Sequence, residues 1–76
     1  MRNFKEIRET MTEEALSIES VMRGHQRIQL NELAEACFIK PETVEFILTQ
    51  MECAGMVHRV AFNRYSLTPE YKKAWM

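Results

Sequence analysis

The sequence predicts one small domain of the α+β class, mainly α-helical with a small antiparallel β-sheet. Apolar residues recur at helical spacing through the first third of the chain and again over residues 41–54. Residues 56–67 instead hold two β-rich runs around a short turn. The 76 residues are 46% hydrophobic and 28% charged, which allows a single core and excludes a disordered chain.

The N-terminal third is predicted to be helical, with Gly24 ending the helix. Either this helix is continuous, or a capping box of Thr10 and Glu13 restarts it and leaves residues 1–9 as an arm or a helix extension. Its apolar stripe consists of Phe4, Ile7, Met11, Ala15, Ile18 and Met22.

Residues 28–30 alternate apolar and polar side chains and are predicted to form a short strand. Asn31 is the expected N-cap of a first short helix over residues 32–37. Residues 38–40 interrupt the helical pattern and form the predicted turn. The expected inward residues of the short helix are Leu33, Ala34 and Cys37.

A longer helix is predicted from Pro41 to Ala54, because proline suits the first helical position. Gly55 should end it in a left-handed conformation. The predicted inward stripe is Val44, Ile47, Leu48 and Met51.

Residues 56–62 and 65–67 are predicted strands that form a hairpin around Asn63 and Arg64. With residues 28–30 they would make a three-stranded sheet. Thr68 and Pro69 are typical of an N-cap followed by proline at the first helical position, so a last short helix should follow.

This order resembles a winged helix-turn-helix domain, with residues 31–54 as the helix-turn-helix and residues 56–67 as the wing. The stretch LNELAEACFIKPETVEFILTQMECAGMVHRV is similar to that of many bacterial regulators, and the resemblance covers about residues 12–68. It implies three helices, a short antiparallel wing, a short C-terminal helix, and a small bacterial or phage transcriptional regulator that binds double-stranded DNA. The matching positions are Leu33, Ala34, Ile39, Thr43, Val44, Leu48, Met51, Glu52 and Gly55.

Two small bacterial groups are similar in size and order: regulators of pilus phase variation and winged-helix partners of ferrous-iron transport. The second group usually carries a cysteine-rich wing that binds a cluster or metal. This chain has no cysteine after Cys53, so the resemblance favours a generic regulator.

If the protein binds DNA, its longer motif helix should enter the major groove. The outward stripe of that helix contains Glu42, Phe46, Thr49 and Cys53. Carboxylates at Glu42 and Glu45 would meet phosphates, which leaves open whether DNA is bound at all. The predicted DNA contacts are Lys40, Thr43, Thr49 and Gln50 in the major groove and Arg59, Asn63 and Arg64 at the wing.

The alternative function is protein binding, in which Phe46 anchors an adaptor or inhibitor to its partner, rimmed by Glu42 and Glu45. A toxin, inhibitor or adaptor of phage or plasmid type is a third hypothesis. In addition, Phe4, Ile7 and Met11 extend the N-terminal stripe beyond what a compact winged helix must bury, which predicts a homodimer through this helix.

The composition argues against other classes. Cys37, Cys53, His25 and His58 lack the paired spacing of zinc sites, and no nucleotide-binding glycine motif or catalytic constellation is present, so no metal, cofactor or enzyme activity is predicted. No apolar run reaches the length of a membrane span and the first residues are charged, so we expect a cytoplasmic protein. Residues 1–55 carry 6 basic and 10 acidic groups, whereas residues 56–76 carry 4 and 1.

Overall fold

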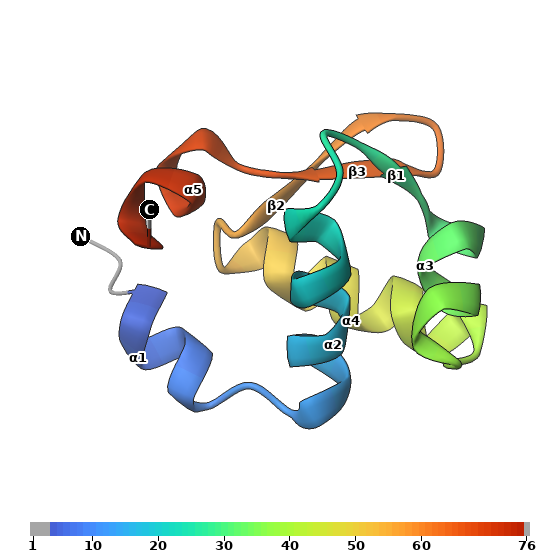
Figure 1. Cartoon of the computed structure of the whole chain (residues 1–76), viewed down its shortest axis with the longest axis horizontal. Helices are drawn as coiled ribbons and strands as arrows, with labels where there is room; N and C mark the ends of the chain where they lie inside the picture. Colours follow the sequence, from blue (N-terminus) through green and yellow to red (C-terminus); the bar gives the residue numbers. More distant parts are fainter. Residues whose placement is uncertain (1–3, 76) are drawn as a thin grey trace.

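Helices dominate the structure, a computed structural model that describes residues 4–75, with side chains to residue 74 (Figure 1). The predicted α+β winged-helix architecture is confirmed. Residues 1–3, which the sequence assigned to an arm or helix extension, lie outside the described residues. The elements are α1 (Phe4–Glu9), α2 (Glu13–Arg23), β1 (Ile28–Gln29), α3 (Leu30–Cys37), α4 (Pro41–Cys53), β2 (Val57–Ala61), β3 (Arg64–Leu67) and α5 (Pro69–Trp75).

The N-terminal third divides into α1 and α2, so of the two alternatives the restarted helix is the one observed, with residues 4–9 helical and with a cap other than the predicted Thr10. Thr12 is the N-cap of α2, and its hydroxyl accepts a 3.2 Å hydrogen bond from the amide of Ala15. The hydroxyl of Thr10 instead donates to the carbonyl of Ile7, at 2.8 Å, and so satisfies the end of α1. Two threonines two residues apart thus serve opposite helix ends, which the capping-box pattern alone does not distinguish.

Helix α3 starts at Leu30, earlier than predicted, and its N-cap is Gln29 rather than Asn31. Gln29 makes no side-chain capping bond. The amide of Leu30 instead donates a 2.9 Å hydrogen bond to the carbonyl of Asn63 in the hairpin turn. Strand β1 is correspondingly one residue shorter than predicted, because Leu30 belongs to the helix.

The turn between α3 and α4 begins at Phe38, which ends α3 in the left-handed conformation, with φ of 55°. Pro41 occupies the first turn of α4, as predicted. Gly55 follows this helix with φ of 82°, so its predicted left-handed role is confirmed. All four residues of the predicted inward stripe, Val44, Ile47, Leu48 and Met51, are buried.

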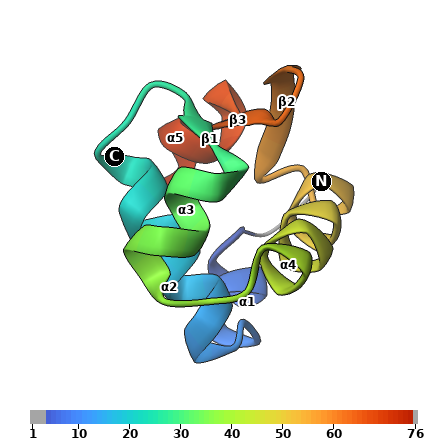
Figure 2. The same cartoon turned by 90° about the vertical axis from the view of Figure 1, so that its right-hand side faces the viewer.

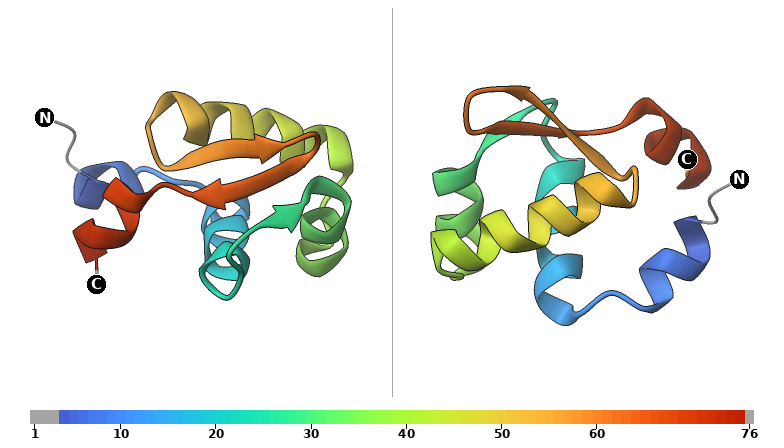
Figure 3. Two further views of the ribbon diagram at one scale, coloured as in Figure 1. Left: turned by 90° about the horizontal axis from the view of Figure 1, so that it is seen from above. Right: turned by 180° about the vertical axis from the view of Figure 1, so that it is seen from behind.

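The three strands form one antiparallel sheet in the order β1-β3-β2, and the predicted three-stranded sheet is confirmed. Ala61 pairs with Arg64, so the hairpin turn consists of Phe62 and Asn63, not of Asn63 and Arg64. Asn63 has a φ of 56°, a conformation that asparagine tolerates better than other non-glycine residues. Seen from above, β2 runs alongside α4 (Figure 3).

Helix α5 opens as predicted, because the amide of Tyr71 donates to the hydroxyl of Thr68 at 3.2 Å. That hydroxyl also donates to the carbonyl of Gly55, at 2.7 Å, and so connects α5 to the end of α4. The ring of Phe4 in α1 meets the ring of Tyr71 edge-on, with centroids 5.2 Å apart. Helices α1 and α5 therefore lie side by side at the left of Figure 1.

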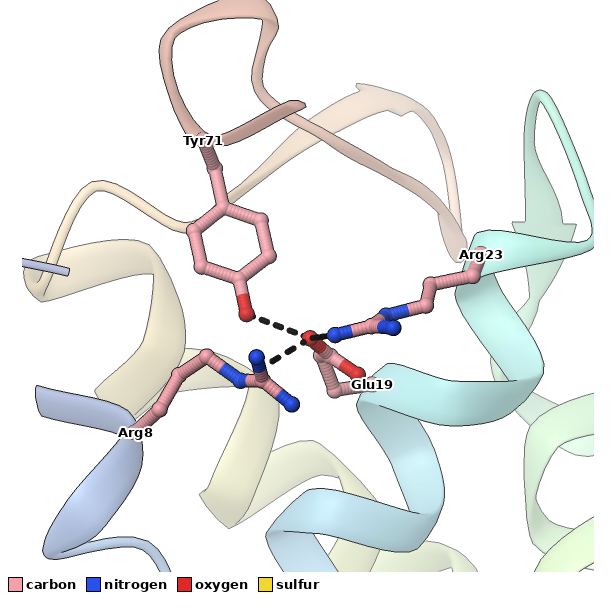
Figure 4. Close-up of polar contacts among 4 residues, drawn as sticks. All are labelled: Arg8, Glu19, Arg23 and Tyr71. Carbon is pink, nitrogen blue, oxygen red and sulfur yellow. Dashed lines mark hydrogen bonds and ion pairs between the residues drawn. The ribbon is translucent and has the colours of Figure 1, made fainter. Parts of the chain in front are cut away.

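A buried carboxylate holds this corner of the molecule together (Figure 4). Glu19 of α2 is only 1% exposed and accepts a hydrogen bond from the hydroxyl of Tyr71. The guanidinium groups of Arg23 and Arg8 lie 2.8 Å and 3.5 Å from the same carboxylate oxygen. The cluster joins α1, α2 and α5.

The apolar stripe of the N-terminal segment packs mainly within the chain. Phe4, Ile7 and Met11 are half-buried and lie against the hydrophobic core. The predicted surplus of apolar surface is therefore partly covered by the protein itself, since Phe4 packs on Tyr71 of α5 and Ile7 and Met11 border a groove along α4. A homodimer through this segment stays a prediction.

None of the helices within residues 4–75 is long and apolar enough to cross a membrane. In the same part of the chain, no three His, Cys, Asp or Glu side chains converge on a site for a metal ion. Cys37 is half-buried, Cys53 is exposed, and neither forms a disulfide. Burial raises the pKa of the Cys37 thiol.

Candidate nucleic-acid interface

Two chain segments that are distant in sequence lie at the same end of the molecule. The α3–α4 turn and the β2–β3 turn are both at the right of Figure 1, and Figure 2 looks onto this end. We call it the wing end and define it by residues 38–43 and 61–64. Lys40, the exposed N-cap of α4, and Arg64, the exposed first residue of β3, both belong to it.

Helix α4 presents three different surfaces besides its buried stripe. On the flank toward β2, the carboxylates of Glu45 and Glu52 act electrostatically on Arg59. On the opposite flank, Gln50 borders a shallow groove with Ile7 and Met11 of the N-terminal segment. The helical repeat of 100° per residue then directs Glu42, Phe46 and Cys53 outward between the two flanks.

The predicted major-groove residues are divided among these surfaces. Lys40 is exposed at the wing end, and Thr49 is exposed on the flank toward the wing. Gln50 is exposed on the other flank, and Thr43 on that flank is half-buried. The structure therefore places Gln50 beside the N-terminal segment, whereas Lys40 and Thr43 lie at the start of α4, at the wing end.

The hydroxyl of Thr49 has one hydrogen bond within its own helix. It donates to the carbonyl of Glu45 at 2.9 Å. The proton is thus committed, and only the lone pairs of the oxygen remain to accept. In a DNA major groove such an acceptor suits the amino group of cytosine or adenine.

The side chain of Arg59 is anchored on the sheet. Its guanidinium donates a 2.8 Å hydrogen bond to the hydroxyl of Tyr65, its cross-strand neighbour. It also lies 5.3 Å from the centroid of that ring, within the range of a cation–π contact. The hydrogen bond to Tyr65 and then the carboxylates of Glu52 and Glu45 raise the pKa of Arg59.

The hairpin turn is braced against the helix-turn-helix. Besides the bond between Leu30 and the carbonyl of Asn63, Gln29 pairs with Arg64 across β1 and β3. The backbone of Asn63 and Arg64 is therefore held by β1 and the start of α3 as well as by β2. The remaining side of the turn faces solvent, because Phe62, Asn63 and Arg64 are all exposed.

Charge divides sharply between α4 and the hairpin. Glu42, Glu45 and Glu52 are all exposed on α4, where no basic residue follows Pro41. The sequence then contains no acidic residue between Glu52 and Glu70, whereas His58, Arg59 and Arg64 fall in that interval. The hairpin is the part of this surface suited to a polyanion.

Large exposed apolar side chains concentrate on the same elements. Phe46 is 57% exposed, which confirms its predicted outward position on α4. Phe38 in the α3–α4 turn is 96% exposed and Phe62 in the hairpin turn is 85% exposed. Sequence reasoning missed these two, because it assigned Phe62 to a strand and gave Phe38 no role. The signal available was that neither fits the inward stripe of a neighbouring element.

No family model and no curated protein matches the chain. Among solved structures, the crystal structure of ligand-free NadR is similar, with a TM-score of 0.76 and 25% sequence identity. The match covers 88% of this chain and 52% of the NadR chain, so the protein corresponds to about half the length of that neighbour. The similarity agrees with the winged helix-turn-helix arrangement of α2 to β3.

Proposed function

We propose that the protein is a small DNA-binding transcriptional regulator that uses its winged helix-turn-helix. The observation that carries this proposal is the wing end, where the start of α4 and a basic hairpin free of carboxylates are presented together. A helix-turn-helix contacts DNA with the first turns of its second helix. The structural similarity to NadR supports a regulator-like role.

In this proposal the start of α4 enters the major groove. Lys40 would contact a phosphate, and Thr49 would accept a hydrogen bond from a base amino group. Thr43 and Gln50 would contact the strand on the side of α1. Glu42 and Glu45 are compatible with DNA where they accept from cytosine amino groups, which is a rarer contact that would add sequence preference.

The wing would supply the electrostatic part of the affinity. Arg59 and Arg64 are exposed cations, and Asn63 between them offers an amide. Because Arg59 is already held by Tyr65, less side-chain entropy is lost when it contacts a phosphate. These contacts position the protein without reading sequence.

The test is the affinity for labelled duplex DNA of random sequence at several salt concentrations. We expect affinity to fall steeply with salt, because phosphate contacts release counterions. The double variant Arg59→Ala/Arg64→Ala should reduce the slope of log affinity against log salt by about 1.8, the value for two lost phosphate contacts. Absence of binding by the wild-type protein at low salt would refute the proposal.

The matched control is Lys72→Ala/Lys73→Ala, which removes the same charge from α5, away from the wing end. It should leave the slope nearly unchanged. If the two double variants behave alike, binding depends only on net charge and the wing has no special role. Circular dichroism of each variant would establish that the fold is retained.

A second candidate function is protein binding through α4, and the exposed Phe46 beside Glu42 and Glu45 favours it. An aromatic anchor inside a polar rim is typical of docking surfaces. Under this hypothesis Phe46→Ala would abolish capture of a partner, whereas Arg59→Ala/Arg64→Ala would not. Unchanged capture by Phe46→Ala would exclude this surface.

A further inference from the structure

We propose that Phe62 at the tip of the wing is a wedge that inserts into the minor groove of duplex DNA and partly unstacks a base step. This inference rests on the proposed DNA binding and adds a contact that reads the deformability of DNA. The inference is based on the geometry of the hairpin tip, where an almost fully exposed phenyl ring extends from a backbone that is hydrogen-bonded on two sides.

The turn gives no local reason for a phenylalanine. Two-residue hairpin turns favour glycine, asparagine, aspartate and serine, whose backbone freedom or short polar side chains suit the turn. Asn63 fulfils that demand at the second position, with its positive φ. Phe62 at the first position has an 85% exposed ring and belongs to no part of the hydrophobic core.

The support beneath the ring is fixed. The carbonyl of Asn63 accepts from the amide of Leu30 at 2.9 Å, and Arg64 pairs with both Gln29 and Ala61. The wing tip is therefore attached to the start of α3 as well as to its own strands. A side chain on such a scaffold is positioned before it binds, so it loses little backbone freedom on insertion.

The charges around the ring identify the occupant as nucleic acid. Arg64 follows the turn directly and is exposed, whereas Arg59 on β2 is within the electrostatic reach of Glu52 and Glu45 of α4; the hairpin itself contains no carboxylate. A minor groove runs between two rows of phosphates, and the apolar faces of the stacked bases become accessible from it when a base step is partly unstacked. An exposed apolar ring two residues before an exposed arginine suits that order, and proteins that kink DNA insert phenylalanine among other apolar side chains in this way.

The start of α4 and the wing tip lie at the same end of the molecule, with the tip at the top of Figure 2 and the start of α4 below it, so the wedge would contact a part of the duplex separate from that met by α4. The inferred wedge then predicts a preference for sites that are easily unstacked opposite the wing. Pyrimidine–purine steps such as TA are the most readily opened. Sequence specificity at this base step would come from how easily the step is unstacked, without hydrogen bonds from the wing to the bases.

The experiment uses two short duplexes, each carrying 2-aminopurine beside a central step, which is TA in one and GC in the other. The full chain should increase the 2-aminopurine fluorescence of the TA duplex on binding. Phe62→Ala should abolish the increase and weaken binding to this duplex about tenfold, the size expected for one lost base–aromatic stack. Its salt dependence should be that of the wild type. Phe62→Leu, which retains an apolar wedge, should restore part of the signal.

Phe38→Ala is the comparison, because it removes another exposed phenyl ring of the wing end that lies outside the hairpin, so it can alter affinity but should not alter unstacking. It should retain the fluorescence increase. Salt-sensitive binding of the wild type without any increase would overturn the wedge and leave the proposed function standing. An equal loss in Phe38→Ala and Phe62→Ala would also overturn it, since general stickiness of exposed rings would explain both. Failure of the wild type to bind either duplex would refute the proposed function together with the wedge.

Discussion

Glu19 is the residue whose environment departs most from expectation. A carboxylate that is 1% exposed is costly to desolvate unless charged and hydrogen-bonding partners surround it. Here two guanidinium groups form ion pairs with one of its oxygens, and a phenol donates a hydrogen bond to the same oxygen (Figure 4). The negative charge of Glu19 is therefore balanced at the point where three helices join. The hydrogen bond to Glu19 also raises the pKa of Arg23, which keeps that partner cationic.

Replacing Glu19 by glutamine should lower the free energy of unfolding by about 1–3 kcal/mol, the range for buried hydrogen bonds to charged groups. The amide keeps the shape of the side chain but removes the charge that Arg8 and Arg23 face. Urea denaturation would measure the loss. Glu14→Gln, at an exposed position of the same helix, is the control and should change stability by less than about 0.5 kcal/mol. Equal effects of the two substitutions would show that the cluster contributes nothing.

The phenol of Tyr71 should make stability depend on alkaline pH. Burial, and next the hydrogen bond to Glu19, raise the pKa of Tyr71 from 10.0 to about 12. The folded state thus holds the proton more tightly, and its contribution to stability is complete below pH 10 and lost as pH rises through about 12. We expect the free energy of unfolding to fall across this window.

The measurement is urea denaturation at successive alkaline pH values for the wild type and for Tyr71→Phe. Lysine titration affects both proteins, so the difference between their curves isolates the phenol. The wild-type advantage should shrink as pH passes from 10 to 12. Parallel curves would contradict the prediction.

Among the elements, α5 has an N-terminus that is capped by a single hydroxyl. Thr68 accepts from the amide of Tyr71 and donates to the carbonyl of Gly55, and its side chain is buried. Thr68→Ala should therefore cost about 1–2 kcal/mol of stability, as for other lost N-caps. Thermal unfolding would measure the loss. Thr68→Ser retains the hydroxyl and should recover most of the stability, so a loss as large as that of Thr68→Ala would refute the capping role.

The acidic side chains of α4 limit the positive potential of the neighbouring hairpin. Strand β2 lies beside α4, so the acidic flank of the helix faces Arg59 of the strand. The carboxylates of Glu45 and Glu52 partly neutralise a cation that the proposed function assigns to phosphates. The hairpin tip, farther along the strand at Phe62 and Asn63, has no acidic residue in sequence near it.

At the scale of the whole molecule, charge distribution decides how strongly the protein meets a polyanion. The formal net charge is −1, with the acidic excess in the first 55 residues. Glu42→Gln/Glu45→Gln should increase affinity for duplex DNA by up to about thirtyfold at low salt, because two exposed charges each contribute up to about 1 kcal/mol. Fluorescence anisotropy with a labelled duplex would measure it.

The charge-matched control is Glu13→Gln/Glu14→Gln, at the start of α2. It should increase affinity less, since these side chains lie on another element and act at longer range. Equal increases would mean that net charge alone controls binding. A decrease for Glu42→Gln/Glu45→Gln would instead indicate that these carboxylates contact bases directly.

The sequence by itself determined the order of the elements and the inward face of α4. The buried face of a helix can be predicted from the three- and four-residue spacing of its apolar residues. Val44, Leu48 and Met51 have this spacing in the sequence itself. The roles of Pro41, Gly55 and Thr68 at helix ends could also be predicted, because each acts on the conformation of neighbouring residues. The outward position of Phe46 followed from the same geometry.

Tertiary structure alone decided the rest. The start of α3 depends on the carbonyl of Asn63, which is more than thirty residues away in sequence. The burial of Glu19 depends on Tyr71 and Arg8, which come from the two ends of the chain. The meeting of α4 and the wing at one end depends on how the sheet closes against the helices. Spacing encodes the face of an element, but contacts between distant segments have no local pattern, so the interface itself appears only in the folded chain.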